Sequence, residues 1–281
     1  MGINRLDLDV LIQLKNKEYI PNKGAVIEIG AQQISNDFLA AQAEINQIGK
    51  QFGAPLPHPF PSPLPSGLVN GGCEPLHSDA PMAKLFWEWL GFDYAAVDID
   101  GSPGSIALDL NFDSVPQNLL GKYHLVTNYG TTEHVANQLN AFKIIHEFTA
   151  LGGVMIHAIP AQGMLNHGLF NYNPKFFWML ARSNGYKWLY AHCTKPTVYY
   201  PLPQNIMDQI LSFNPHLAGE QQQYQFADSG IIMVMQKVFN TPYVPALDVN
   251  TGTKTDNKML KERYWSVFQE NAFDNIDLPS Q

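Results

Sequence analysis

Short apolar runs recur along the chain, and segments with helical periodicity separate them. The runs are nearly continuous in apolar character and fall at 25–29, 94–98, 123–128, 153–158, 187–192 and 231–235. Continuous apolar strands are typical of a parallel sheet that is buried on both faces. Their alternation with helices predicts an α/β fold, with a mostly parallel sheet and helices on both of its faces.

The helices expected between the strands begin and end at residues that favour such boundaries. Segment 82–90 follows Asp79 and Pro81 and stops before Gly91. A capping residue, an early proline and a C-terminal glycine are common signals of helix ends. Three further helices are predicted at 9–14, 139–151 and 174–184.

Two regions interrupt the alternation of strands and helices. Residues 34–80 separate the first two strands by far more than a usual connection, and the part from 53 to 75 contains alternating prolines. Proline removes a backbone donor and favours an extended chain, so this part is predicted to be neither helix nor central strand. We interpret 34–80 as an insertion in a domain spanning 1–240, either a flap over the carboxyl edge of the sheet or a surface linker. The polar segment 241–281 is expected to pack on this domain or on a second subunit of a homo-oligomer.

The composition is that of an acidic chain: its 281 residues include 17 Lys and Arg against 25 Asp and Glu, a net charge of −8. Such a chain lacks the clustered cations that nucleic acid or an anionic membrane surface requires. Its two cysteines, Cys73 and Cys193, are too far apart for a Cys-x-x-Cys metal or redox motif. The first residues lack the features of a signal peptide, and no apolar run approaches about 20 residues, so a cytoplasmic protein is expected.

Polar residues follow several predicted strands, at the edge where open parallel sheets bind their ligands. Glu28 and Gly30 close the first strand and Asp98 closes the second. Asp109 marks a third polar tip, and 128–135 combines a glycine, hydroxyls, a carboxylate and an imidazole after the next strand. Turn formation by Asp98 and helix capping within 128–135 are the alternatives to ligand binding.

These segments, in this order, resemble the class I S-adenosylmethionine-dependent methyltransferases. The resemblance covers about residues 24–192 and rests on EIG, VDIDG, LDLN, YHLVTNYGTTEHV and GGVMIHAIP. Segment 166–174 is similar to a substrate-side segment found in one branch of that family. The resemblance implies a Rossmann-like, seven-stranded sheet whose last strand is antiparallel, and S-adenosyl-L-methionine as the cofactor.

The resemblance also implies which residues would contact the cofactor. By position, the methionine end of the cofactor would lie against Glu28, Gly30 and Ala31, and the ribose against Asp98. The adenine would lie against Ile99, Asp109 and Leu110, and the sulfonium against Asn128 and Tyr129. The sequence departs from the family pattern after Gly30, where Ala31, Gln32 and Gln33 replace further glycines. Gln32 must therefore either point away from the ligand or form a hydrogen bond with it.

Transfer of a methyl group to oxygen or nitrogen benefits from a base whose pKa is near the working pH, and histidine fits this need. His167 is our first choice, because it lies in the loop at the expected substrate mouth, and His134 is the second. His157 lies inside an apolar strand and is interpreted as a core residue. The residues expected to contact the acceptor are Glu133, Phe170 and Tyr172.

The sequence leaves alternatives open. No metal-ligand spacing such as His-Glu-x-x-His is present, so we expect no metal, although a metal-assisted variant through Glu133, His134 and His167 is conceivable. A nicotinamide dehydrogenase would need two further glycines after Gly30, and both are missing. The favoured hypothesis is a methyltransferase that acts on an oxygen, nitrogen or carbon atom of a small molecule. A catalytically inactive binding or scaffold protein of the same fold is the alternative.

Overall fold

The described residues of the computed structural model contain eight strands that form one sheet: β1 (Gly24–Ile29), β2 (Phe92–Val97), β3 (Ser105–Ile106), β4 (Tyr123–Tyr129), β5 (Thr149–Gln162), β6 (Lys187–Lys195), β7 (Val198–Pro201) and β8 (Ser229–Gln236). Their order across the sheet is β3-β2-β1-β4-β5-β8-β6-β7. The strands from β3 to β5 are parallel, whereas β8 is antiparallel to both β5 and β6, and β7 is antiparallel to β6. The structure describes residues 2–62, 80–99, 104–164, 167–195, 198–201, 229–249 and 253–268.

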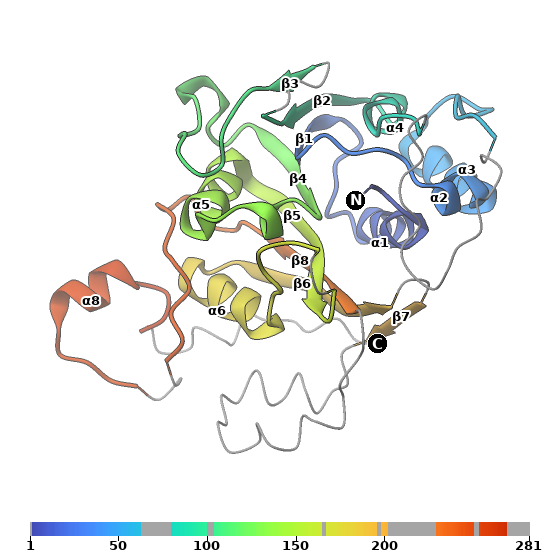
Figure 1. Ribbon diagram of the computed structural model, residues 1–281. Helices are drawn as coiled ribbons and strands as arrows, with labels where there is room; N and C mark the ends of the chain where they lie inside the picture. The colour runs from blue at the N-terminus through green and yellow to red at the C-terminus, as the bar shows by residue number, and fades with distance from the viewer. Residues whose placement is uncertain are drawn as a thin grey trace.

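Helices cover both faces of the sheet (Figure 1). One face carries α1 (Arg5–Asn16), α2 (Asn36–Ala40), α3 (Gln42–Phe52) and α4 (Lys84–Trp89), and the other carries α5 (Gln138–Phe148) and α6 (Pro174–Asn184). The described residues also form two 3-10 turns, η1 (Gln117–Leu119) and η2 (Thr132–His134), and the helix α8 (Lys258–Arg263). Across the described part of the chain, no helix has the length and apolar character needed to span a bilayer.

The core consists of two apolar layers, one on each face of the sheet. Alternate residues of β1 enter opposite layers: Ile27 packs in the layer of α5 and α6, and Val26 packs in the layer of α1 to α4. Phe142 and Phe177 are fully buried in the first layer. Because both faces of the central strands are covered, nearly every position along them is apolar.

The predicted fold class is confirmed. The sheet is mostly parallel, helices lie on both faces, and β8, the last strand in the chain, runs antiparallel to its neighbours. The short strand β7 extends the sheet by one strand beyond the seven that the resemblance implies. The first helix begins at Arg5 rather than at residue 9, because Asn4 and Asp7 form a reciprocal capping box at its start.

The insertion between the first two strands contains the helices α2 and α3, which pack beside α1. Beyond α3, Phe60 is buried against Phe38, Phe86 and Trp89 in the same helical layer. The indole of Trp89 donates to the carbonyl of Pro55 at 2.8 Å. Residues 63–79, which carry the later prolines of the expected flap or linker, lie outside the described residues.

The described part of the C-terminal segment lies against α6. Arg182 donates to the carbonyl oxygens of Val249 and Val267, and Lys175 forms an ion pair with Asp248 at 2.7 Å. Gly185, at the end of α6, leaves the space that Phe239 and Trp265 fill. These contacts attach the described residues 241–249 and 253–268 to α6.

Candidate functional site

Asp98 lies at the carboxyl end of β2 and faces the loop after β1. Its Oδ2 accepts a hydrogen bond from the backbone N–H of Ala31 at 3.0 Å, which holds the two strand ends together. The next residue, Ile99, exposes 73% of its surface. A half-buried carboxylate beside an exposed apolar side chain can receive a polar group and a flat apolar group of one ligand.

Glu28 is completely buried at the end of β1, where three donors surround its carboxylate. The indole of Trp87 and the hydroxyl of Tyr94 each donate at 2.8 Å, and the backbone N–H of Gln32 donates at 3.0 Å. Burial raises the pKa of Glu28 to about 7, while the three hydrogen bonds act in the opposite direction. Through these bonds Glu28 connects β1 to α4, to β2 and to its own loop.

The loop after β1 touches the loop after β4 directly above Gly30. This glycine has a φ of +79°, and a Cβ atom there would lie 2.3 Å from the hydroxyl of Thr131. The side chain of Gln32 turns back over the same residue and donates to the carbonyl of Gly30 at 2.9 Å. Gln32 and Thr131 therefore lie over the backbone at the position that the resemblance gives to the methionine end of the cofactor.

Asn128 and Tyr129, at the end of β4, are both buried. The amide of Asn128 donates to the hydroxyl of Thr132 at 2.8 Å, lies 3.2 Å from Nδ1 of His157, and accepts from the N–H of Thr132. These bonds start the η2 turn directly after the strand. His157 is buried between Phe142 and Phe177, and burial lowers the pKa of its imidazole to about 3.

Asp109 and Leu110 lie on the turn that follows β3. The carboxylate of Asp109 accepts from the N–H of Asn111 at 2.8 Å, and the N–H of Asp109 donates to Asp113 at 2.7 Å. Leu110 is buried, and its carbonyl accepts from Asn140 of α5. Asp109 thus shapes this turn, and the turn is fastened to the start of α5.

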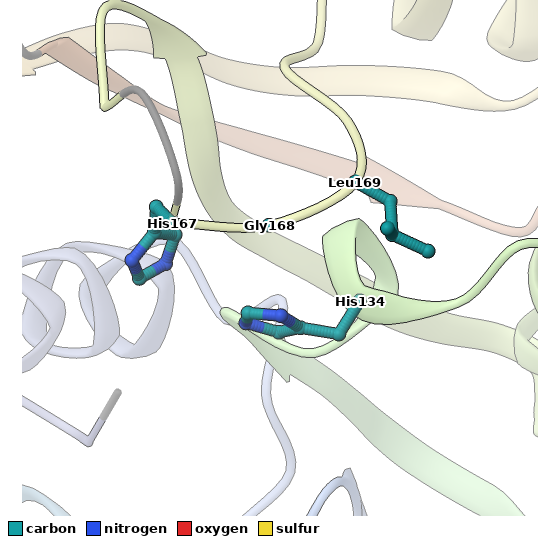
Figure 2. Close-up of a pocket in the computed structure, with 4 residues that line it drawn as sticks. All are labelled: His134, His167, Gly168 and Leu169. Carbon is teal, nitrogen blue, oxygen red and sulfur yellow. The ribbon is translucent and has the colours of Figure 1, made fainter.

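Glu133, His134 and His167 meet at the same edge of the sheet. Figure 2 shows the two imidazoles facing one space, His134 from η2 and His167 from the loop between β5 and α6. Oε1 of Glu133 lies 3.9 Å from Nε2 of His134 and 3.6 Å from Nε2 of His167. Together with Gly168 and Leu169, the two histidines line an open hollow of about 380 Å³.

The carboxylate of Glu133 has no exposed surface, whereas the side chains of His134 and His167 are 48% and 33% exposed. Burial raises the pKa of Glu133 to about 7. Burial and the neighbouring imidazole of His167 lower the pKa of His134. The histidines thus form the accessible surface of the cluster, and Glu133 lies beneath them.

Gly168 brings the second histidine against this carboxylate. A Cβ atom on Gly168 would lie 2.9 Å from Cγ and 3.0 Å from the carbonyl oxygen of Glu133. That same carbonyl accepts from the N–H groups of Leu169 and Phe170, at 2.7 and 3.1 Å. The loop after β5 therefore packs directly on η2, and only glycine fits at the contact.

Of the two aromatic residues expected at the acceptor, Tyr172 is buried and Phe170 is partly exposed. The hydroxyl of Tyr172 donates to Gln138 at 2.6 Å, and its ring packs on Phe142 and Phe177. Asn166, next to His167, lies outside the described residues. Phe170, the residue after Leu169, thus has a ring that is accessible to an acceptor. Tyr172 is buried and supports the loop.

The comparison of the chain with known proteins found similarity to solved structures only. No protein-family profile and no curated protein matches the sequence. A 1,6-didemethyltoxoflavin-N1-methyltransferase of Burkholderia thailandensis is similar at 10% identity, over 84% of this chain and 78% of its own, with a TM-score of 0.42. A SAM-dependent methyltransferase of Archaeoglobus fulgidus is similar at 11% identity, over 82% and 94%, with a TM-score of 0.36. Similarity of this extent carries no conclusion about activity.

Glu133, His134 and His167 could be predicted from the sequence as members of the site. Three residues that hold the loops together at this edge of the sheet could not. Gly168 appeared only as part of a loop, and Thr131 only as a possible helix cap. Gln32 was noted as a departure from the family pattern, without its contact to Thr131. Each acts through a residue that lies far away in the chain, and a single sequence carries no local signal for such a pairing.

Proposed function

We propose that the protein is an S-adenosyl-L-methionine-dependent methyltransferase that acts on an oxygen or nitrogen atom of a small molecule. The observation that carries this proposal is that Asp98 and the cluster of Glu133, His134 and His167 lie at the same edge of the sheet. The loops after β1, β2, β4 and β5 all begin at this edge, because these strands are parallel. Contacts between Ala31 and Asp98, and between Gln32 and Thr131, connect these strand ends.

The residues on the ribose side fit the cofactor. Asp98 offers a carboxylate, the group that accepts hydrogen bonds from ribose hydroxyls in nucleotide-binding sheets. Ile99, which is largely exposed, offers apolar surface to adenine. The remaining residues of the site are proposed to shape the loops around the cofactor. They are Glu28, Gly30, Ala31, Asp109, Leu110, Asn128 and Tyr129. When bound, S-adenosyl-L-methionine supplies the methyl group on a good leaving group.

On the acceptor side, the protein's task is to orient the nucleophile and to remove its proton. We propose that Nε2 of His167 would take the proton of the acceptor O–H or N–H. The lone pair of the acceptor atom would bond to the methyl carbon while the bond from that carbon to sulfur breaks. His134 would orient the acceptor from the other wall of the hollow, with Glu133 behind both imidazoles. Alignment of this kind alone can lower a barrier by several kcal/mol. The acidic chain and the half-exposed ring of Phe170 favour a neutral or cationic acceptor with an apolar part.

Binding of the cofactor tests this proposal without knowledge of the acceptor. Calorimetric titration with S-adenosyl-L-methionine and its demethylated product is expected to show one site per chain. Asp98→Ala should weaken binding at least tenfold. Asp98→Asn, which keeps an acceptor for the N–H of Ala31, should separate loss of the charge from loss of the loop contact. If the wild-type protein binds neither compound, the enzymatic proposal is wrong.

One observation favours the alternative of a scaffold protein. The side chains of Gln32 and Thr131 lie over Gly30, where the family usually has further glycines. A protein that had lost the cofactor would have no need to keep this space open. Gln32→Ala separates the two functions: in an enzyme it alters the affinity for S-adenosyl-L-methionine, and in a scaffold the wild type and the variant both fail to bind it.

A further inference from the structure

The cluster of Glu133, His134 and His167 combines the ligand types of a transition-metal site. Among the described residues these three form a group in which one oxygen and two nitrogen atoms lie within 4.8 Å of one another. They come from η2 and from the loop before α6, so no contiguous sequence motif announces them. We propose that they bind a divalent transition-metal ion of the Zn²⁺ type, with the hollow in front of them as the open coordination position.

The distances suit such an ion. Two atoms bound to one Zn²⁺ at about 2.1 Å in a tetrahedron lie roughly 3.4 Å apart. Oε1 of Glu133 lies 3.6 and 3.9 Å from the two imidazole nitrogens. The three ligand atoms all lie within 4.8 Å of one another. The side chains of His134 and His167 are partly exposed, so they have room to move the two imidazole nitrogens to that spacing.

The carboxylate of Glu133 supports the proposal independently. It has no exposed surface, and within the described structure neither of its oxygen atoms has a hydrogen-bond partner. Both imidazole nitrogens lie beyond hydrogen-bond distance from it. A buried carboxylate without a partner is costly, and native proteins usually satisfy it with a hydrogen bond, an ion pair or a metal. Here a cation between Glu133 and the two histidines would satisfy it.

The ligand set determines the class of ion. Two imidazoles and one carboxylate suit Zn²⁺, Fe²⁺ and similar ions, and the combination of two His with one Glu occurs in catalytic zinc sites with an open position. Mg²⁺ and Ca²⁺ prefer oxygen ligands throughout. The hollow of about 380 Å³ beside His134 and His167 leaves the fourth position accessible to water or to an acceptor atom.

Ion binding at this site is expected to affect methyl transfer, an expectation that rests on the proposed function. Coordination and proton acceptance use the same lone pair on Nε2 of His167, so one imidazole cannot do both at once. Zn²⁺ is therefore expected to inhibit methyl transfer in which His167 is the base. Binding of the ion itself is independent of methyl transfer and is measured without the cofactor.

The test is calorimetric titration of the untagged, metal-free protein with Zn²⁺, together with the visible absorption of bound Co²⁺. The wild type is expected to bind one ion per chain with micromolar or tighter affinity. Glu133→Gln, His134→Ala and His167→Ala should each weaken binding at least tenfold, and the double histidine variant should abolish it. His124→Ala, an exposed histidine away from the cluster, is the matched control and should bind like the wild type.

Thermal unfolding of each metal-free variant separates loss of a ligand from loss of the fold. Failure of the folded wild type to bind Zn²⁺, or unchanged binding by the double histidine variant, would overturn the metal site. Neither result bears on methyl transfer, because the Asp98 titrations test the cofactor site through residues outside the cluster. Conversely, a protein that binds Zn²⁺ but no S-adenosyl-L-methionine would retain the metal site and lose the proposed enzyme.

Discussion

At the scale of single residues, some polar groups of the core are held in place by the side chains around them. His157 illustrates this, because its ring lies between Phe142 and Phe177 while its Nδ1 contacts the amide of Asn128. That amide also fixes Thr132 at the start of η2. A core histidine thus supports the strand end from which the candidate site begins.

The burial of His157 predicts a specific acid sensitivity. Its pKa is about 3 in the folded protein and about 6.5 in an unfolded chain. The unfolded state therefore binds the extra proton first, and the contribution of the neutral imidazole to stability is lost as the pH falls from about 6.5 towards 3. Between pH 7 and pH 4.5, this loss amounts to roughly 2 to 3 kcal/mol.

His157→Gln removes this titration and keeps a hydrogen-bonding group for Asn128. Urea unfolding at both pH values should show that the variant loses less stability on acidification than the wild type. The quantity to compare is the change in the free energy of unfolding between the two pH values, because the other buried groups titrate equally in both proteins. Equal losses in wild type and His157→Gln would show that His157 is not buried in its neutral form.

At the scale of elements, α6 connects the sheet to the C-terminal segment. The side chain of Asn184, at the end of α6, is buried; it donates to the carbonyl of Val244 at 2.7 Å and accepts from the N–H of the same residue at 2.8 Å. The neighbouring Ser183 accepts from the N–H of Leu247 at 3.2 Å. These bonds satisfy the backbone of residues 244–247, which lie in neither a helix nor a strand.

Removal of these contacts should destabilise the protein in a graded way. Asn184→Ala leaves the N–H and the carbonyl of Val244 buried without partners and is expected to cost about 2 to 3 kcal/mol. Ser183→Ala removes a single bond and is expected to cost about 1 kcal/mol. Urea unfolding measures both values. Equal, small effects would mean that the segment after residue 240 detaches from α6 before the domain unfolds.

The elements could be predicted from the sequence better than the contacts between them. The apolar runs marked the central strands, since burial on both faces requires apolar residues throughout. The longer helix of the insertion, α3, was not predicted, because the prolines that follow it dominate the pattern. The two side-chain donors to Glu28 could not be predicted, since Trp87 and Tyr94 lie about sixty positions further along the chain and reach it only through the fold.

At the scale of the whole molecule, the parallel strands bring residues distant in sequence to one edge. Asp98 and the cluster around Glu133 come from different strand ends, and the loop contacts through Ala31 and Thr131 connect them. The rule that open parallel sheets bind ligands at the carboxyl ends of their strands predicted a site at this edge. It could not indicate that Gln32 lies over Gly30, or that the carboxylate of Glu133 is buried beneath two imidazoles, because both depend on packing between loops.

A crystal structure of the protein with S-adenosylhomocysteine tests the central claim most directly. The account predicts that both ribose hydroxyls lie within hydrogen-bonding distance of the carboxylate of Asp98, with the sulfur atom facing the hollow lined by His134 and His167. A nucleoside bound elsewhere would contradict the account. So would an Asp98 side chain turned away from the ligand, or a groove filled by the protein's own side chains at saturating ligand.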